Sequence, residues 1–329
     1  MTPTASSPLI PVWVRGIRVE AEGIRSFELW PRVGELAEAE AGAHIDVHLP
    51  GGVIRQYSLT NPGESHRYII GVNRDPKSRG GSRHLHEQIR VGDELAISVP
   101  RNHFRLNETA SHSVLVAGGI GVTPLYAMAR RLTELGRPWT FYYCARSQQR
   151  AAFLPELFRL AASATQGGLH PIFDGEPGQA PLDVRGVAQR YRDADLYCCG
   201  PTPLIDAFRE ACSDLPPERV HVEFFGSGPA ATATDAAVPA RKAFQIVLQQ
   251  SGKTLDVPPE KSVLDILLAN GLPVFSSCRE GVCGSCETRV LGGAPEHHDR
   301  VLSPGERASG TTMMVCVSRC KGEKLVLDL

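Results

Sequence analysis

The sequence lacks several features that would place a chain in a special class. Its 329 residues carry 35 Lys and Arg against 36 Asp and Glu, a formal net charge of −1, so no basic excess indicates nucleic-acid binding. No block of like charge suggests a disordered tail. No apolar run is long enough to cross a bilayer. Residues 1–8 lack the basic and apolar regions of a signal peptide. We expect a cytoplasmic protein with no nucleic-acid or membrane partner.

Cysteine is present in a pattern. Cys278, Cys283 and Cys286 have the spacing C-x4-C-x2-C, and Cys316 follows on a separate segment. In plant-type [2Fe–2S] centres, four thiolates with this spacing hold two irons. Gly281 lies between two of the cysteines, where a loop around a compact cluster needs a residue that tolerates positive φ. The pattern predicts a [2Fe–2S] cluster bound by these four cysteines.

Other interpretations of these residues stay open. A structural zinc site would more usually show two paired C-x2-C knuckles. A disulfide is disfavoured because thiols stay reduced in a chain without a secretion signal. Cys320 competes with Cys316 as fourth ligand, but Cys316 is preferred because it lies in the apolar segment 313–317, which is typical of a strand end. His297 and His298 allow a Rieske centre, yet they lack matching Cys–His pairs. The cysteines left over are expected to be mostly small buried apolar residues: Cys144, Cys198, Cys199, Cys212 and Cys320.

Residues 12–100 have the pattern of short strands bounded by Gly, Pro and Asp. In residues 45–49, for example, Ile, Val and Leu alternate with Asp and His, as in a strand buried on one face. Many short strands at this spacing predict a closed or nearly closed antiparallel β-barrel. We expect the strands at 12–19, 24–30, 45–49, 54–60, 68–72 and 94–99.

The segment Arg55-Gln56-Tyr57-Ser58 resembles the R-x-Y-S signature of the ferredoxin-reductase flavin barrel, which makes it a candidate flavin-binding strand. Arg55 and Tyr57 point to the same face, since side chains alternate along a strand. A guanidinium there can hold a phosphate through paired hydrogen bonds, and the Tyr57 ring can lie against an isoalloxazine. Ser58 can donate a hydrogen bond to the flavin edge. The plainer interpretation is a cross-strand Arg and an ordinary barrel Tyr.

Gly80-Gly81-Ser82 is the second candidate flavin contact. Ser82 is a good N-cap, so we expect a short helix to begin here, with free N–H groups that suit a phosphate. The plainer interpretation is a capped helix with no ligand, but together with the Arg55 segment the phosphate interpretation is favoured. The histidines of this helix are expected to lie in solvent: His84 and His86.

A strand, a glycine-rich turn and a helix follow one another at residues 113–135. This layout brings a dinucleotide pyrophosphate to a helix N-terminus, and the glycines allow close approach. Thr123 is expected to be the N-cap and Pro124 the first helical residue. The predicted binding segment is Gly118-Gly119-Ile120-Gly121-Val122-Thr123-Pro124.

Two further segments bear on the nucleotide. Cys199-Gly200-Pro201 follows a short apolar strand and resembles the C-G-P signature of the ferredoxin-reductase family, which implies a place at the carboxyl end of the parallel sheet, near the nicotinamide. Taken alone, the tripeptide would be an ordinary turn. Cys199 is assigned to positioning, because hydride transfer needs no covalent step. Arg146 could bind a 2′-phosphate, but beyond Arg150 no basic cluster supports NADPH, so NADH is favoured.

These motifs resemble known families. The R-x-Y-S, G-G-x-G-x-T-P and C-G-P segments resemble the flavin and NAD(P) domains of ferredoxin reductases, and the last ninety residues resemble plant-type ferredoxins. The order of the three modules resembles the phthalate dioxygenase reductase family, which includes the vanillate O-demethylase reductases. The resemblance implies FMN, NADH and a [2Fe–2S] cluster. It also implies that Phe225 lies by the flavin and yields before nicotinamide stacks, unless that ring merely packs in the core.

The expected fold is an antiparallel flavin barrel (1–110), an α/β domain with a parallel sheet (111–228), a linker (229–240) and an α+β β-grasp ferredoxin domain (241–329). In the last, a hairpin precedes a helix capped by Ser262. The resemblance implies a reductase that feeds a terminal Rieske-type oxygenase acting on an aromatic acid or a related small substrate. The alternatives are a reductase of another acceptor, such as a haem protein or separate ferredoxin, and a non-catalytic redox sensor.

Overall fold

The computed structural model describes the chain except residues 1–8, 77–79, 226–241, 273, 275, 277–278, 283 and 303. The chain divides into two compact units, of which one spans Ser7–Phe225 and the other contains Gly226–Leu329. Among the described residues, no helix is both long and apolar enough to span a membrane.

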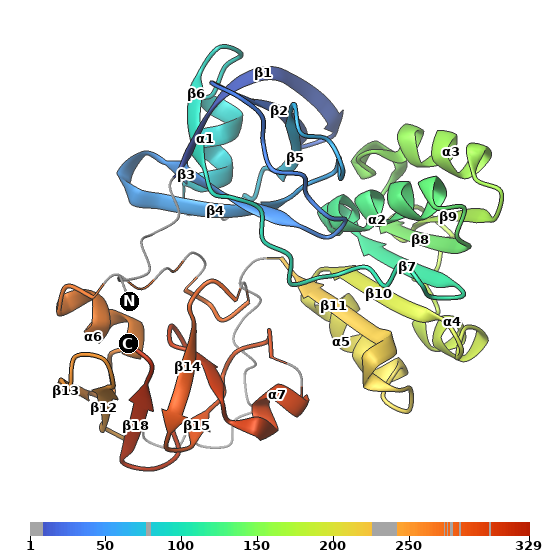
Figure 1. The fold of residues 1–329 in the computed structure, drawn as a ribbon. Coiled ribbons are helices and arrows are strands. Elements are labelled where there is room, and N and C mark those ends of the chain that lie inside the picture. The colour runs from blue at the N-terminus through green and yellow to red at the C-terminus, as the bar shows by residue number, and fades with distance from the viewer. Residues whose placement is uncertain are drawn as a thin grey trace. The chain divides into compact units, whose positions relative to one another are not determined.

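The first unit begins with a six-stranded antiparallel sheet (Figure 1). An isolated bridge between Leu59 and Ile70 connects the two outer strands, β4 and β5, so the sheet curls into the expected barrel. Val12 and Val14 are fully buried, whereas Trp13 between them is half-buried, which is the alternation of a strand with one face on a core. The strand order is β4-β3-β6-β1-β2-β5, with β1 Ile10–Ala21, β2 Ile24–Pro31, β3 His44–Leu49, β4 Val53–Ser58, β5 Tyr68–Asn73 and β6 Glu94–Ile97.

Helix α1 (Gly81–Glu87) corrects two expectations. Its N-cap is Gly80, with φ of 100°, and not Ser82, which lies inside the first turn and accepts a hydrogen bond from the Asp75 N–H at 3.3 Å. Glycine takes this backbone conformation without strain, and no side-chain oxygen caps the helix. His86 is buried, with Nε2 2.9 Å from the Val72 carbonyl oxygen, because this face of the helix packs on β5. The expectation of a solvated His86 was wrong.

The second half of this unit is a five-stranded parallel sheet, as expected, with strand order β11-β10-β7-β8-β9. All six residues of β7 and of β10 are buried, as is usual for central strands covered on both faces. The strands are β7 Ser113–Gly118, β8 Trp139–Ala145, β9 Gly167–Phe173, β10 Asp195–Gly200 and β11 Val220–Phe224. The helices are α2 Val122–Glu134, α3 Leu154–Ser163, α4 Val184–Arg190 and α5 Thr202–Ala211.

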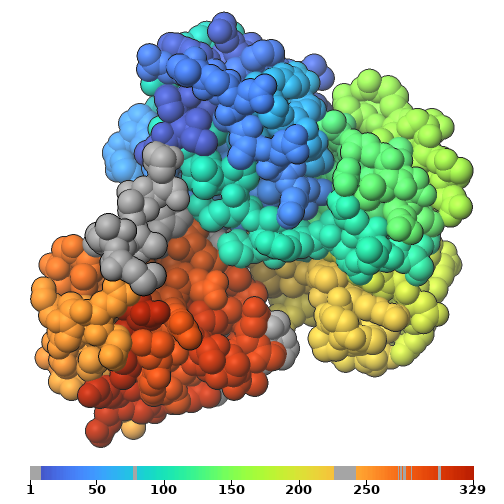
Figure 2. Space-filling view, in the orientation of Figure 1, coloured from blue at the N-terminus to red at the C-terminus, as the bar shows by residue number. Residues whose placement is uncertain are grey.

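The barrel and the parallel sheet share part of one core. Ala21, Ile24, Ala41 and Phe104 belong to the buried cluster that otherwise consists of residues from the α/β domain. In Figure 2 the blue atoms of the barrel lie directly against the green atoms of the α/β domain. The two halves therefore form one body, and side chains from both can contribute to one site.

The second unit has the expected β-grasp elements. β12 (Phe244–Leu248) and β13 (Thr254–Val257) form a hairpin, and α6 (Val263–Ala269) follows. Ser262 caps this helix in a reciprocal capping box with Asp265, which confirms the prediction that Ser262 is its N-cap. The main sheet has the order β13-β12-β18-β14-β16, with β14 Glu287–Gly292, β16 Thr312–Met314 and β18 Lys324–Leu327, and β15 Pro295–Glu296 pairs with β17 Arg319–Cys320; α7 is Pro304–Ser309.

Candidate functional site

Arg55 lies against the first turn of α1. A Cβ added to Gly81 would lie 2.5 Å from Cγ and 2.8 Å from Nε of Arg55, so a side chain here would displace the Arg55 side chain from its present position. The structure thus brings Arg55 of β4 next to Gly80 and Gly81, the two segments from which a flavin phosphate site was predicted. A guanidinium beside the N–H groups at the start of a helix is a suitable environment for a phosphate.

Ser58, at the end of β4, has a buried hydroxyl. The residue is 2% exposed, and its Oγ has no hydrogen-bond partner among the residues that the structure describes. An unpaired buried hydroxyl costs about 1–3 kcal/mol. A ligand acceptor would remove that cost, so Ser58 fits the predicted contact with a flavin edge.

The two residues before Ser58 differ in their surroundings. Tyr57 is half-buried on the barrel core, and burial raises the pKa of its phenol, which therefore stays neutral. Gln56 points to the other face, where its amide nitrogen lies 3.4 Å from Nε2 of His44. Burial, with Arg101 nearby, lowers the pKa of His44 to about 3, so this imidazole is neutral. Arg55, Tyr57 and Ser58 are the members of this strand that fit a flavin.

The glycine-rich loop and the Cys-Gly-Pro segment meet. A Cβ on Gly121 would lie 2.1 Å from the Cys199 carbonyl oxygen, and one on Gly118 would lie 2.6 Å from Cδ of Pro201. These two glycines therefore serve the packing of the loop on β10. Gly119, with φ of 54° and no atom within 4 Å of its Cβ position among those described, is the glycine that a dinucleotide could approach.

The exact limits of both segments differ from those expected. A 3-10 turn (Gly119–Gly121) precedes α2, so the helix begins at Val122 and its N-cap is Gly121. Thr123 is the second helical residue, and its hydroxyl donates to the Ile120 carbonyl at 3.0 Å instead of capping. Cys199 and Gly200 are the last residues of β10 and do not follow it; Pro201 is the N-cap of α5.

Glu223 is a residue that sequence reasoning missed. It lies opposite Cys199 in the pairing of β10 with β11. Its Oε2 is buried without a hydrogen-bond partner in the described part of the chain, and burial raises the pKa of the carboxyl to about 8. It is therefore mostly protonated at neutral pH. The sequence signal was one acidic residue within the apolar run 220–225.

Burial, followed by the charge of Glu223, raises the pKa of the Cys199 thiol well above its usual value. A thiol in this state is a poor nucleophile, which agrees with a positioning role. Phe225, two residues after Glu223, is half-buried and packs on the core of the first unit.

The ends of β8 and β9 carry an exposed acid–base pair. Arg146 Nη1 lies 3.7 Å from Asp174 Oδ1, and the Arg146 side chain is 77% exposed. The Gly175 N–H donates to the Arg146 carbonyl at 3.0 Å and holds the two loops together. Arg146 was a predicted site residue, and Asp174 was not.

Two of the four predicted cluster ligands are described, and Cys278 and Cys283 lie outside the described residues. Cys286 and Cys316 are 3% and 8% exposed, and the Val315 N–H donates to the Cys286 carbonyl at 3.4 Å, so these two cysteines come from adjoining segments. Gly281 has φ of 69°, as a tight cluster loop requires. The described residues contain no group of three potential ligands, as follows when two thiolates are not among them.

The alternative ligands lie in other surroundings. Cys320 is buried in β17, where it pairs with Pro295. His297 Nδ1 is 3.6 Å from Asp299 Oδ1, and His298 Nε2 is 3.4 Å from Glu296 Oε1, so each histidine faces a carboxylate. These positions give no support to a Rieske centre.

Comparison with known proteins identifies the NAD-binding domain and the ferredoxin domain. Residues 246–321 match the model of the 2Fe-2S iron-sulfur cluster binding domain, and residues 115–210 match that of the oxidoreductase NAD-binding domain. The chain is therefore an oxidoreductase of the class that joins an NAD-binding domain to a [2Fe–2S] ferredoxin domain.

Its relatives match over nearly the entire chain. It is 46% identical to phenoxybenzoate dioxygenase subunit beta of Ectopseudomonas oleovorans, over 99% of this chain and 100% of that one, and 47% identical to tetrachlorobenzoquinone reductase of Sphingobium chlorophenolicum, over 97% and 98%. The solved structure of phthalate dioxygenase reductase, described as modular for electron transfer from pyridine nucleotides to [2Fe–2S], is 37% identical over 98% of both chains with a TM-score of 0.67. The protein belongs to the phthalate dioxygenase reductase family. The expected cofactors, NADH, FMN and a [2Fe–2S] cluster, are those of this family.

The same modules occur in a larger protein. An intact type IV self-sufficient cytochrome P450 monooxygenase matches all of this chain at 36% identity with a TM-score of 0.86, and this chain spans 43% of its length.

Proposed function

We propose that this protein is the NADH-dependent reductase component of a multicomponent oxygenase. It takes an electron pair from NADH and delivers single electrons to a terminal oxygenase. One observation carries the proposal: relatives named as parts of dioxygenase systems match this chain from end to end, with the NAD-binding and ferredoxin domains in one polypeptide. The chain supplies electrons and leaves oxygenation to its partner.

The barrel is the proposed FMN site. Arg55 and the N–H groups at Gly80 and Gly81 would hold the phosphate, Tyr57 would lie along the ring system, and Ser58 would donate to its edge. FMN bound there accepts two electrons together and releases them one at a time, which is what a two-electron donor and a one-electron cluster require. The unpaired Ser58 hydroxyl supports this assignment.

The loop from Gly118 to Pro124 is the proposed dinucleotide site. Gly119 leaves the backbone open to the pyrophosphate, and Cys199 gives the nicotinamide a neutral, buried neighbour. The protonated carboxyl of Glu223 can donate a hydrogen bond to a carboxamide oxygen. Phe225 is the proposed ring that covers the flavin until nicotinamide binds.

The pairing of Arg146 with Asp174 supports NADH over NADPH. A carboxylate accepts hydrogen bonds from ribose hydroxyls and repels a 2′-phosphate. Asp174 also occupies the guanidinium that a 2′-phosphate would need. We therefore propose that Arg146 does not select NADPH.

Cys278, Cys283, Cys286 and Cys316 are the proposed ligands of the cluster. The burial of the two described cysteines supports this set. The proposed acceptor is a terminal Rieske-type oxygenase acting on an aromatic acid or related small molecule, since phenoxybenzoate and phthalate dioxygenases are the systems of two relatives.

A second function has specific support. A relative with 47% identity is named tetrachlorobenzoquinone reductase, so a quinone is an alternative acceptor of the same electrons. A quinone accepts electrons directly and needs no partner oxygenase.

Anaerobic titration with NADH and acceptor assays test both functions. Purified protein should contain flavin, iron and sulfide, and NADH should bleach the flavin and cluster bands. Deleting residues from 241 onward should retain NADH-to-dye activity and abolish delivery to an oxygenase. A colourless protein that leaves NADH unconsumed would refute the proposal. Fast turnover with tetrachlorobenzoquinone but none with oxygenases would favour the second function.

A further inference from the structure

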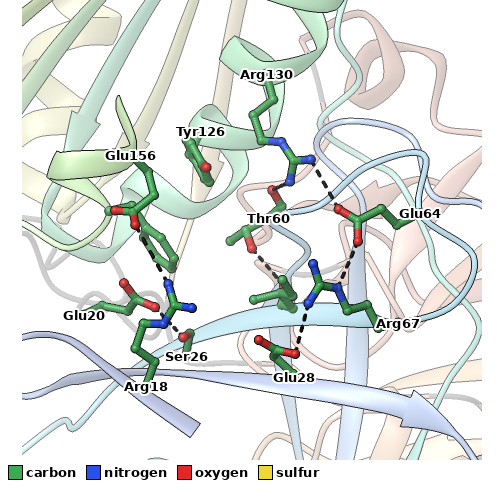
Figure 3. A pocket seen from close by; sticks show the side chains of 12 residues that line it. Arg18, Glu20, Ser26, Glu28, Thr60, Glu64, Arg67, Tyr126, Arg130 and Glu156 are labelled. Atoms are coloured by element: carbon green, nitrogen blue, oxygen red, sulfur yellow. Dashed lines mark hydrogen bonds and ion pairs between the residues drawn. The ribbon is translucent and has the colours of Figure 1, made fainter. Parts of the chain in front are cut away.

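A polar pocket lies within the first unit, where the barrel meets the α/β domain (Figure 3). Its volume is about 230 Å³. Its walls come from β1, β2, β5 and the segment between β4 and β5 on one side, and from α2 and the start of α3 on the other. Three arginines and four glutamates line it. On one side of this pocket, Arg130 of α2 reaches across to the barrel.

Arg130 makes two contacts with the barrel. Its Nη1 donates to the Thr60 carbonyl oxygen at 3.1 Å, and its Nη2 donates to Glu64 Oε1 at 3.3 Å. Burial alone would raise the pKa of Glu64, but hydrogen bonds from Arg67, Asn61 and Arg130 outweigh it, and the pKa lies below its usual range. Glu64 is therefore ionised at neutral pH. The guanidinium forks between a backbone carbonyl and a carboxylate, which fixes its direction as well as its distance.

The carbonyl that Arg130 binds is itself rigidly held. The N–H and the hydroxyl of Thr60 both donate to the Ile69 carbonyl, at 3.0 and 3.2 Å. The next residue, Asn61, is fully buried and accepts from the Ile69 N–H at 2.7 Å. Thr60 follows Ser58 by only two residues. Arg130 is thus attached to the end of the proposed flavin strand.

The other end of α2 leads to the dinucleotide loop. The helix starts at Val122, directly after the turn Gly119–Gly121. Its first turn also contacts the barrel, because a Cβ on Gly71 of β5 would lie 2.7 Å from Cγ2 of Thr123. Helix α2 is therefore fastened to the barrel at its first turn and again two turns later, at Arg130.

We propose that Arg130 is a positioning residue for hydride transfer. This inference rests on the function proposed above. It sets the distance between the dinucleotide loop and the flavin strand through α2. Hydride transfer requires reacting atoms about 3–3.5 Å apart, and a misplacement of about 1 Å can cost about a hundredfold in rate. Because α2 also contacts the barrel through Thr123 and through the shared core, the loss of Arg130 should allow a smaller displacement.

Arg130→Gln and Arg131→Gln form a matched pair. Arg131 is the next residue of α2 and is also ion-paired, with its Nε 2.7 Å and its Nη2 3.2 Å from the carboxylate oxygens of Glu108. Both substitutions remove one charge from the same helix. Of the two arginines, only Arg130 is bound to the end of the flavin strand. A difference in flavin reduction rate between the two variants therefore results from the loss of this attachment and not from the loss of a charge.

The measurement is anaerobic stopped-flow reduction of the flavin by NADH, with the nicotinamide–flavin charge-transfer absorbance recorded together. In Arg130→Gln we expect a rate about tenfold lower and a weaker charge-transfer band, with unchanged flavin content. Arg131→Gln should match the wild type. Equal rates and bands in the two variants would overturn the proposal.

A conservative variant covers the case in which Arg130→Gln does not fold. Arg130→Lys retains the charge, but its compact ammonium group lacks the planar guanidinium that contacts the Thr60 carbonyl and Glu64 together. We therefore expect partial rescue, with a rate between those of Arg130→Gln and the wild type. A wild-type rate and band in Arg130→Lys would also overturn the proposal. If NADH does not reduce the wild-type flavin at all, the proposed function fails, and the positioning role fails with it.

Discussion

Gly121→Ala should damage NADH use far more than its size suggests. The new Cβ would lie 2.1 Å from the Cys199 carbonyl oxygen, 2.4 Å from the Cys199 carbonyl carbon and 2.7 Å from the Gly200 nitrogen. All three are backbone atoms of β10, so no side-chain rotation can relieve the contact. The dinucleotide loop must move away from Cys199 by about 1 Å, a displacement that can cost about a hundredfold in rate.

The assay separates this effect from general destabilisation. Overpacking of this kind typically costs about 1–3 kcal/mol, measured as a lower melting temperature. Flavin reduction by NADH should fall by about a hundredfold, while flavin binding in the barrel stays intact. Gly136→Ala, just beyond the end of α2 and outside the loop, is the matched control: its Cβ meets no atom within 4 Å among those described, but its φ of 64° costs about 1–2 kcal/mol in a non-glycine residue. The control should lose stability without the same loss of rate from loop displacement.

A specific result would refute the reasoning. If Gly121→Ala reduces its flavin at the wild-type rate, the packing of this glycine on Cys199 does not set the position of the loop. If Gly119→Ala alone loses NADH use, the loop glycines act mainly through contact with the nucleotide.

Three further predictions concern single side chains. Glu223→Gln should remove a pH dependence: since its pKa is raised to about 8, the native protein binds a proton that the unfolded chain releases, so wild-type stability should fall from about pH 5 to pH 8 and the variant should lose that slope. Equal slopes in urea titrations would contradict this. Ser58→Ala should raise the stability of the flavin-free protein by about 1 kcal/mol and weaken FMN binding, as calorimetry can measure. Cys286→Ser should lower iron content and abolish delivery to the acceptor while NADH-to-dye activity remains.

Much of the fold could be predicted because local signals were strong. The hairpin after residue 243 and the capping box at Ser262 are short-range patterns, and both are present in the structure. Helix α4 was not predicted: only Val187 and Ala188 of its seven residues are buried, so the sequence there has little periodicity. Ser82 was a plausible cap by residue type, but the helix starts two residues earlier, with Gly80 at positive φ as its N-cap.

The site was harder to predict because it depends on contacts between distant segments. Glu223 is unremarkable in sequence, and only the parallel pairing of β11 with β10 places it opposite Cys199. Asp174 likewise becomes a candidate site residue only because the structure places it beside Arg146, at the end of the neighbouring strand. The contacts of Arg130 with Thr60 and Glu64 join residues about seventy positions apart, and no local sequence pattern predicts them.

The glycine-rich loop and the Cys-Gly-Pro segment are two parts of one structural unit. Considered alone, the first motif suggests that its glycines exist to admit a phosphate. In the structure the glycines have different roles. Gly118 and Gly121 pack closely against Pro201 and the backbone of β10, whereas no described atom lies within 4 Å of the Cβ position of Gly119. Each motif therefore requires the other, because a side chain at Gly121 would displace Cys199 as surely as it would displace the loop. The proximity of the two segments in space is thus a packing requirement of this domain, and it places the proposed pyrophosphate and nicotinamide contacts at one end of the sheet.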